Sequence, residues 1–323
     1  MVSSRTRFDV SNHRSPSVSV VVPCLNEERN LPYVFSRMPA DVTEVVFVDG
    51  GSKDRSVQRA RELWPSVVVV NQTRTGKGNA LACGFAACTG DIVVMLDADG
   101  STDPAEIPRF LAPLLDGADF AKGSRFLPGG GSSDITRFRR MGNYGLCAIV
   151  NGLFRTRFSD LCYGYNAFWR RVLPYMDLPD TEDAAPAGQM IWGDGFEVET
   201  LINIRMAMSK LRVDEVASME AARMHGVSNL NAFGDGQRVL STILREFRRR
   251  RTPVAVDDPA VVDTPVVLER PVVVASHIVV DSPVERPMVV PQPVMVPAQP
   301  SAHFSDRMML GASHEPVAVT GEG

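Results

Sequence analysis

The chain has 323 residues, a formal net charge of −4 and five cysteines. This length suits one large domain or two ordinary ones, and the slight acidic surplus argues against a nucleic-acid-binding protein, which usually has a basic excess. The cysteines are not spaced as zinc-binding pairs, so we interpret them as reduced thiols. The polar start lacks the apolar core of a signal peptide, and no run of about 18 apolar residues predicts a membrane span. The sequence therefore predicts a cytoplasmic protein.

Composition changes sharply near Arg251. Beyond it, residues 252–323 hold eleven of the chain's 23 prolines together with many valines. Proline at this density breaks helices and central strands. We therefore predict one folded domain over residues 17–251, a disordered N-terminus over residues 1–16 and a disordered Pro/Val-rich tail over residues 252–323. A partner-binding role for the tail is the alternative.

The predicted domain alternates short apolar runs with helical patterns. In chain order we expect a strand at 18–22, a helix near 27–38, a strand at 45–48, a helix near 54–63, a strand at 67–70, a helix near 78–88, a strand at 92–96, a helix near 105–115 and a strand at 119–122. This alternation predicts an α/β fold, with a mostly parallel sheet flanked by helices on both faces. Ligands of such sheets bind beyond the carboxyl ends of the strands.

The fourth strand ends in two carboxylates, Asp97 and Asp99, within VVMLDADGSTDP. Carboxylates avoid apolar surroundings unless they are paired or bind a cation. The next helix has its own start signals, because Asp103 is a good N-cap, Pro104 suits the first helical position and Glu106 completes a capping box. Asp97 and Asp99 are not needed for capping, so we interpret them as ligands of a divalent cation, Mg²⁺ or Mn²⁺.

Polar loops also follow the second and third predicted strands. DGGSKDRS begins at Asp49, and NQTRTGKG contains Arg74 and Lys77. Cationic side chains and the backbone N–H groups of a glycine-rich helix start suit phosphate oxygens. The spacing matches neither a P-loop nor a dinucleotide fingerprint. We therefore expect a phosphate-bearing donor and a divalent metal at one edge of the sheet.

Four successive segments, VSVVVPCLNEERNL, VVFVDGGSKDRS, GKGNALACGFAACTGD and VVMLDADGSTDPAEI, resemble the motifs of family 2 glycosyltransferases. The resemblance implies the GT-A fold and inverting transfer of a sugar from a nucleotide-diphosphate donor. Within that family the chain looks most like the polyprenyl-phosphate (dolichyl-phosphate mannose synthase-like) sugar transferases. DLCYGYNAFWRR at 160–171 and RMHGVSNL at 223–230 resemble their later motifs. A metal-dependent hexosyltransferase with a polyprenyl phosphate acceptor is therefore expected.

The resemblance implies a role for each matching residue. It places Asp49 against the base, Lys77 near the base or the diphosphate, and Arg223 at the donor diphosphate or the acceptor phosphate. Asp97 begins the D-x-D signature, and Asp99 is its main metal ligand. The residues expected to line the nucleoside pocket are Pro23, Asn26 and Glu27.

Three features depart from the family pattern. Gly50 stands where a second acid often follows Asp49, and Gly100 and Ser101 replace a Leu-Gln pair whose glutamine binds the metal. His225 stands where the synthases tend to have an arginine. Two interpretations of His225 are open: a third metal ligand that replaces the missing glutamine, or a loop histidine without that role.

A further acidic cluster, Asp194, Glu197 and Glu199, lies in WGDGFEVETLI. GDGFEVE resembles the segment of related transferases that faces the donor sugar or the acceptor. If the acceptor is a hydroxyl, Asp194 or Glu197 is the expected catalytic base. A polyprenyl phosphate is already anionic and needs little base catalysis. Asp194 is also suited to cap the helix that follows.

A lipid acceptor would require contact with a membrane surface. The segment 236–251, GQRVLSTILREFRRRR, has an apolar helical face and clustered arginines. It either rests on an anionic membrane surface, which would make the protein peripheral at the inner face of the membrane, or packs on the domain. The glycine-rich segment 126–140 is expected to form a mobile loop over the site.

Three other functions are weighed against this one. The first is a family 2 glycosyltransferase with a soluble hydroxyl acceptor. The second is a sugar-phosphate nucleotidyltransferase, which would need a glycine-rich basic loop where the chain has PCLNEERN. The third is a non-catalytic nucleotide-sugar-binding protein, which the presence of both D-x-D acids argues against.

Overall fold

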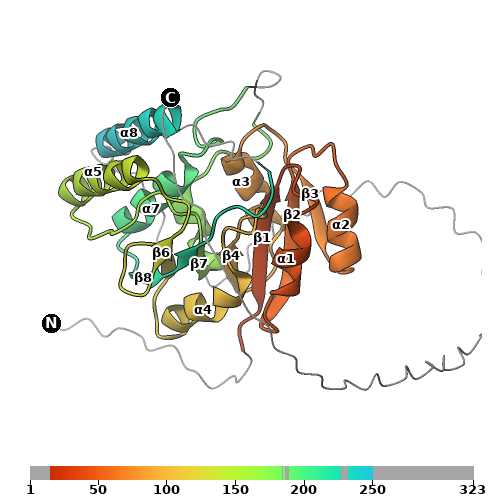
Figure 1. The fold of residues 1–323 in the computed structure, drawn as a ribbon. Helices are drawn as coiled ribbons and strands as arrows, with labels where there is room; N and C mark the ends of the chain where they lie inside the picture. The colour runs from red at the N-terminus through yellow and green to blue at the C-terminus, as the bar shows by residue number, and fades with distance from the viewer. Residues whose placement is uncertain (1–14, 184, 186–188, 227–231, 250–323) are drawn as a thin grey trace, which may run out of the picture. The chain divides into compact units, whose positions relative to one another are not determined.

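The computed structural model describes residues 15–183, 185, 189–226 and 232–249 (Figure 1). All of these residues belong to one folded unit. The predicted tail, 252–323, and nearly all of the predicted disordered N-terminus lie outside the described residues. Disorder at both ends, and the domain boundaries with it, therefore stay predictions.

A seven-stranded sheet lies at the centre of the unit (Figure 1). Its order is β3-β2-β1-β4-β7-β5-β8, and β7 runs antiparallel to both neighbours while the other pairs are parallel. The strands are β1 (Val18–Cys24), β2 (Val42–Asp49), β3 (Val68–Asn71), β4 (Ile92–Met95), β5 (Phe120–Ser124), β7 (Asn166–Trp169) and β8 (Val213–Ala217). The short strands β6 (Gly131–Ser132) and β9 (Met219–Glu220) form a separate pair. The predicted mostly parallel α/β sheet is confirmed.

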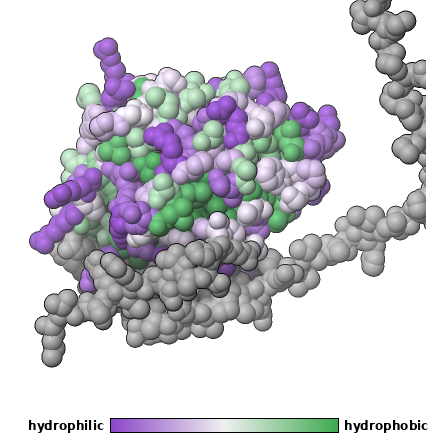
Figure 2. Space-filling view, turned by 90° about the horizontal axis from the view of Figure 1, so that it is seen from below, coloured by the Kyte–Doolittle hydropathy of each residue, from purple (hydrophilic) through white to green (hydrophobic). Residues whose placement is uncertain are grey.

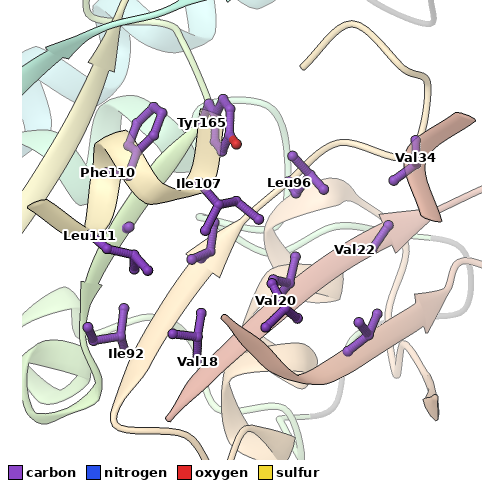
Figure 3. Packing of buried hydrophobic residues seen from close by; sticks show 14 of the residues in the cluster. Val18, Val20, Val22, Val34, Ile92, Leu96, Ile107, Phe110, Leu111 and Tyr165 are labelled. Carbon is purple, nitrogen blue, oxygen red and sulfur yellow. The ribbon is translucent and has the colours of Figure 1, made fainter. Parts of the chain in front are cut away.

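Helices cover both faces of the sheet (Figure 1). One core packs α1 (Leu31–Ser36), α2 (Ser56–Leu63) and α4 (Ile107–Leu115) on the sheet, and a second packs α3 (Lys77–Ala87), α6 (Leu173–Met176) and α7 (Val198–Met208). The side chains of β1 alternate between the two cores, since Val20 and Val22 belong to the first core and Val21 belongs to the second. Burial on both faces explains the continuous apolar run of this strand. Figure 3 shows the first core.

A third cluster joins α5 (Arg137–Phe154), α7 and α8 (Ala232–Arg249). Val239 and Ile243 of α8 are buried in it. Of the two interpretations of segment 236–251, packing on the domain is therefore confirmed for Val239 and Ile243, while Leu240 and Leu244 of the same helix are 39% and 44% exposed, and membrane contact stays a prediction. The predicted mobile loop at 126–140 contains β6 and the first turn of α5, so part of it has regular structure.

The first helix begins later than predicted. Asn26 has a left-handed backbone (φ 58°), and the backbone N–H groups of Asn30 and Leu31 both donate to the carbonyl of Glu27. Residues 27–30 therefore form a turn, and α1 begins at Leu31 rather than at residue 27. Asparagine tolerates the left-handed conformation better than most residues.

The start of α4 confirms one predicted cap and corrects another. The Asp103 side chain accepts from the backbone N–H of Ala105 at 2.9 Å, as an N-cap does. A short 3₁₀ turn (Pro104–Glu106) then leads into α4. Glu106 does not complete a capping box, because its carboxylate accepts from Ser218 and Arg109 instead.

The described surface mixes polar and apolar side chains. Figure 2 shows one such face, where a hydrophobic patch is bordered by hydrophilic residues. The helices α5 and α8 have 18 residues each. Neither these nor any other helix in the described ranges is long and apolar enough to cross a membrane.

Candidate active site

The predicted acidic residues meet at the carboxyl edge of the sheet. Both β2 and β4 pair in parallel with β1, so their carboxyl ends lie on the same side. Asp49 is the last residue of β2, while Asp97 and Asp99 lie in the loop between β4 and the 3₁₀ turn. The Asp99 carboxylate accepts from the backbone N–H of Ser101 at 2.9 Å, which holds the loop in a tight turn.

A polar cavity of about 330 Å³ lies at the ends of β2 and β3. Asp49 is nearly buried in its wall and accepts from the backbone N–H of Ser52. Gly51 has φ +86°, a backbone conformation that favours glycine. The carboxylate, amide and backbone groups suit a flat ring with N–H donors and carbonyl acceptors. The lining residues are Asp49, Gly50, Gly51, Asn71, Gln72, Thr73, Arg74, Thr75, Ala185 and Gln189.

The loop after β1 lies against this region. A side chain added at Gly50 would come within 3.1 Å of the Cys24 carbonyl, so the loop and the start of the cavity wall are in close contact. Pro23 is within β1, and the Asn26 side chain accepts from the backbone N–H of Lys53 at 2.7 Å. Asn26 therefore ties the first loop to the second. The pocket-lining role of Pro23, Asn26 and Glu27 stays a prediction.

Lys77 is enclosed between two acids. Its Nζ lies 2.7 Å from Asp97 Oδ1 and 2.8 Å from Glu199 Oε1. Burial would lower the pKa of Lys77, but these two carboxylates outweigh burial and raise it above its ordinary value. The lysine is therefore a fixed positive charge beside the D-x-D loop.

Glu199, a member of the predicted acidic cluster, is the second partner of Lys77. It lies in the first turn of α7 and is 5% exposed. Gly164 leaves room for its contact with Lys77, because an added Cβ would lie 3.0 Å from Glu199 Oε1 and 3.2 Å from Lys77 Nζ. The sequence grouped Glu199 with Asp194 and Glu197 but did not predict its pairing with the distant Lys77.

Arg223 bridges the first loop and the D-x-D loop. Its Nη1 lies 2.5 Å from Glu27 Oε1, and its Nη2 lies 3.1 Å from Asp99 Oδ2. The next residue, Met224, donates its backbone N–H to the Asp99 carbonyl at 3.4 Å. The His225 carbonyl accepts from Asn30 Nδ2 at 3.1 Å. The structure thus brings Arg223 to Glu27 and Asp99 and the His225 backbone to Asn30, while the roles that the resemblance implies for both residues stay predictions.

A divalent metal fits the donor set at Asp97 and Asp99 in charge and in kind. Both side chains are partly exposed, at 31% and 19%, and a guanidinium already lies beside Asp99 as a stand-in cation. Across the described ranges, no three or more His, Cys, Asp or Glu side chains form a metal-binding group. The rest of the coordination shell would come from phosphate oxygens and water. The third-ligand role of His225 stays a prediction.

Asp194 is held by Arg74 rather than capping a helix. Arg74 Nε and Nη2 lie 2.8 and 3.0 Å from the two Asp194 carboxylate oxygens, and both side chains are buried. The residue at the N-cap position of α7 is Glu197, so the capping interpretation of Asp194 is wrong. Bidentate pairing of this kind occupies both oxygens.

Glu197 is also buried, at 4% exposure. Its Oε1 accepts from the backbone N–H groups of Gly193 and Gly195, at 3.1 and 3.2 Å. Its Oε2 has no hydrogen-bond partner among the described residues. This buried oxygen is the one unpartnered acceptor of the predicted Asp194/Glu197 pair in the described structure.

A second buried ion-pair network lies beyond the predicted site. Arg125, at the end of β5, pairs with Asp160 at 2.7 Å and with Glu220 at 3.0 Å. Burial would raise the pKa of Asp160, but the Arg125 guanidinium outweighs it and holds that pKa below its ordinary value. The motif DLCYGYNAFWRR thus begins at an acid that anchors the end of β5.

The fold and the acidic sheet edge define a GT-A protein, and the comparisons with known proteins agree. Residues 19–175 match the model of glycosyl transferase family 2. The chain therefore carries a glycosyl transferase family 2 domain at these residues. Dolichol-phosphate mannosyltransferase of Pyrococcus furiosus is 34% identical over 131 residues, which is 38% of this chain and 37% of that protein.

Two further relatives extend over more of the chain. Glycosyltransferase AglJ of Haloferax volcanii is 29% identical over 246 residues, which is 73% of each chain. Glucosyl-3-phosphoglycerate synthase of Mycobacterium tuberculosis, solved with Mn²⁺, UDP-glucose and phosphoglyceric acid, has 25% identity and a TM-score of 0.55, covering 74% of this chain and 82% of that one. The chain spans 37% and 49% of the length of the first curated relatives it matches.

Proposed function

We propose that this protein is an inverting glycosyltransferase that moves a sugar from a nucleotide-diphosphate donor to a polyprenyl phosphate. The observation that carries the proposal is the arrangement at the sheet edge. The cavity bordered by Asp49 suits a nucleoside, and Asp97 and Asp99 suit a metal that binds the diphosphate. Relatives named for polyprenyl-phosphate transfer support this choice of acceptor.

The chain's own groups would act on the leaving diphosphate. Asp99, with Asp97 beside it, would hold Mg²⁺ or Mn²⁺, which supplies positive charge to stabilise that leaving group. Lys77 and Arg223 are the nearest fixed cations of the D-x-D loop, and they would add to the stabilisation. Attack from the opposite face of the sugar would invert the anomeric centre.

The pairing and burial of the carboxylate oxygens of the two candidate bases favour an anionic acceptor. Both oxygens of Asp194 are engaged by Arg74, and Glu197 has one engaged oxygen and one buried one. A hydroxyl acceptor needs a carboxylate that is open to take its proton. A phosphate acceptor needs no such base. This is consistent with Asp194, whose two carboxylate oxygens are both paired with Arg74.

Contact with a membrane would come through α5 in this proposal. Four large apolar residues on α5 are exposed: Phe138 at 67%, Met141 at 72%, Tyr144 at 54% and Ile149 at 39%. Exposed arginines precede and follow this face, at Arg137, Arg140, Arg155 and Arg157. Apolar residues flanked by arginines suit the surface of an anionic membrane. The enzyme would then work in the cytoplasm, peripheral to the inner face of the membrane.

A second candidate is transfer to a small soluble acceptor. It is favoured by the likeness to glucosyl-3-phosphoglycerate synthase, whose structure holds phosphoglyceric acid. In this case Glu197, through its unpartnered Oε2, would be the expected base. His225 as a metal ligand belongs with either candidate.

Radiolabel transfer from a panel of UDP- and GDP-sugars tests the proposal. The reaction would contain Mn²⁺ and undecaprenyl phosphate or 3-phosphoglycerate in separate tubes. Label in an organic-extractable product that depends on the lipid phosphate is the expected result. Label in a water-soluble product alone would establish the second candidate instead, and no transfer with any donor would overturn both.

A further inference from the structure

Arg223 occupies the same carboxylate that a metal would need. Its Nη2 lies 3.1 Å from Asp99 Oδ2, and its Nη1 is anchored on Glu27. A divalent ion and a guanidinium on the same carboxylate oxygen would lie close together and repel each other. Binding of a metal through Oδ2 would therefore require Arg223 to leave that oxygen.

The segment around Arg223 is fastened across the D-x-D loop by backbone contacts. The Ala221 N–H donates to the Ser101 carbonyl at 2.8 Å, and the Met224 N–H donates to the Asp99 carbonyl at 3.4 Å. A side chain at Gly100 would meet Met224 Sδ at 3.1 Å. These contacts of the chain itself place the arginine on Asp99.

The two cations of the loop differ in how easily they can move. The Lys77 side chain is 16% exposed and lies between two acids, and the first turn of its helix is locked by the Gly78–Asp194 contact. The Arg223 side chain is 22% exposed, and its Nε is buried without a hydrogen-bond partner among the described residues. Arg223 therefore has an unused donor, whereas the Lys77 ammonium is held by two carboxylates.

We propose that Arg223 is a placeholder cation that occupies Asp99 until the donor arrives and that couples donor binding to metal binding. The inference rests on the proposed metal site at Asp99. A donor diphosphate offers Arg223 new anionic oxygens, including a partner for Nε. Asp99 is then released to the metal. Each ligand consequently raises the affinity for the other, as reciprocal coupling requires.

Manganese binding by electron paramagnetic resonance tests the proposal without turnover. The dissociation constant for Mn²⁺ is measured on the full chain with and without saturating UDP. In wild type, Mn²⁺ alone should bind weakly and UDP should tighten it. Arg223→Gln should bind Mn²⁺ alone at least about fivefold more tightly, the lower end of ordinary coupling effects, and the gain from UDP should shrink by a similar factor.

Arg37→Gln is the matched control. Arg37 pairs with Asp103, four residues beyond Asp99. Its loss therefore removes one positive charge near the D-x-D loop without freeing Asp99. Its Mn²⁺ affinity should equal that of wild type. Arg223→Lys, which keeps the charge but cannot bridge Glu27 and Asp99 with a planar fork, should lie between wild type and Arg223→Gln. It also provides a result if Arg223→Gln does not fold.

Two outcomes would overturn the proposal, and they are distinct. If Arg223→Gln and Arg223→Lys bind Mn²⁺ no more tightly than Arg37→Gln, Arg223 does not compete with the metal. If Asp99→Asn leaves Mn²⁺ binding unchanged in all backgrounds, the metal does not bind at Asp99. The second result would also remove the metal site from the proposed function, whereas the first would leave it intact.

Discussion

The backbone N–H of Gly78 donates to the carbonyl of Asp194 at 2.6 Å, which joins the first turn of α3 to the segment before α7. A Cβ at position 78 would lie 1.8 Å from the Gly193 carbonyl, and a Cβ at position 76 would lie 2.1 Å from that of Asp194. The glycines of TGKG thus permit the two backbones to touch. This contact places Lys77 at the D-x-D loop.

Gly78→Ala should therefore destabilise the protein by several kcal/mol, because backbone must move to remove the overlap. Gly142→Ala is the control, since a Cβ at this exposed position of α5 would meet nothing within 4 Å. The control should gain about 0.5–1 kcal/mol from the better helix former. Urea unfolding of both variants gives the comparison. Equal stability of Gly78→Ala and wild type would mean that the Gly78–Asp194 contact is not required.

Asp99→Ala should abolish sugar transfer while leaving the fold intact, because Asp99 is partly exposed and its loss frees Arg223 rather than burying a charge. Addition of EDTA to wild type should have the same effect on activity. Transfer is measured with the donor found by the panel, and folding by the melting temperature. Full turnover of wild type in EDTA would contradict metal dependence.

Glu197→Gln should reduce transfer by less than about tenfold if the acceptor is a phosphate. The amide is the same size and its oxygen can still accept from Gly193 and Gly195. Removal of a true general base usually costs about 10²–10⁴ in rate. A loss in that range, measured as kcat at saturating donor, would point to a hydroxyl acceptor and to Glu197 as its base.

The Asp160–Arg125 pair should make stability depend on pH in the acid range. The pKa of Asp160 is below its ordinary value of 3.8 in the folded protein. A depressed pKa gives stability that is present above the unfolded pKa and is lost as the pH falls through the folded one. Asp160→Asn should therefore cost about 3–5 kcal/mol at pH 7, as breaking a buried pair does.

The measurement is urea unfolding of wild type and Asp160→Asn between pH 7 and pH 3. The difference in unfolding free energy should stay constant down to about pH 4, near the unfolded pKa of Asp, and then shrink. A difference that shrinks between pH 7 and pH 5 would mean that another group titrates with this pair.

The exposed face of α5 should govern vesicle binding. Phe138→Ser with Met141→Ser should weaken flotation with anionic vesicles by about tenfold or more, since each apolar side chain that enters the interface adds on the order of 1 kcal/mol. Leu115→Ser is the control, because Leu115 is 61% exposed on α4. Binding should also fall as salt rises, since charges are screened over about 10 Å at 0.1 M salt. Equal losses in both variants would exclude α5 as the contact.

The sequence predicted β1 to β5 because most of these strands contain a short apolar run, but it did not predict β6 to β9, whose residues are more mixed, as in VDEVA of β8. Val18–Cys24 and Ile92–Met95 contain the predicted runs almost unchanged. Asp97 and Asp99 were recognised for a related reason, as carboxylates placed directly after such a run, where Asp103 already serves as the cap. These features depend on neighbours in the chain.

Partners far apart in the chain could not be predicted in this way. Arg74 and Asp194 are 120 residues apart, and neither was expected to pair with the other. Glu106 was misassigned for the same reason, because its partner Ser218 lies on a distant strand end. A local capping pattern could not reveal this competition. Side-chain pairing across the sheet edge requires the fold itself.

The position of β7 has a consequence for how the chain can be made. Asn166–Trp169 lies between β4 and β5 in the sheet, although it is synthesised about forty residues after β5. Until it emerges from the ribosome, the edge of β4 has no partner on that side, and an unpaired apolar edge invites association with other chains. A fragment that stops at Ser124 would hold every D-x-D residue and yet be prone to aggregate. The half of the domain that holds the D-x-D residues is therefore not expected to fold alone, and nascent chains that end before β7 are expected to need chaperones.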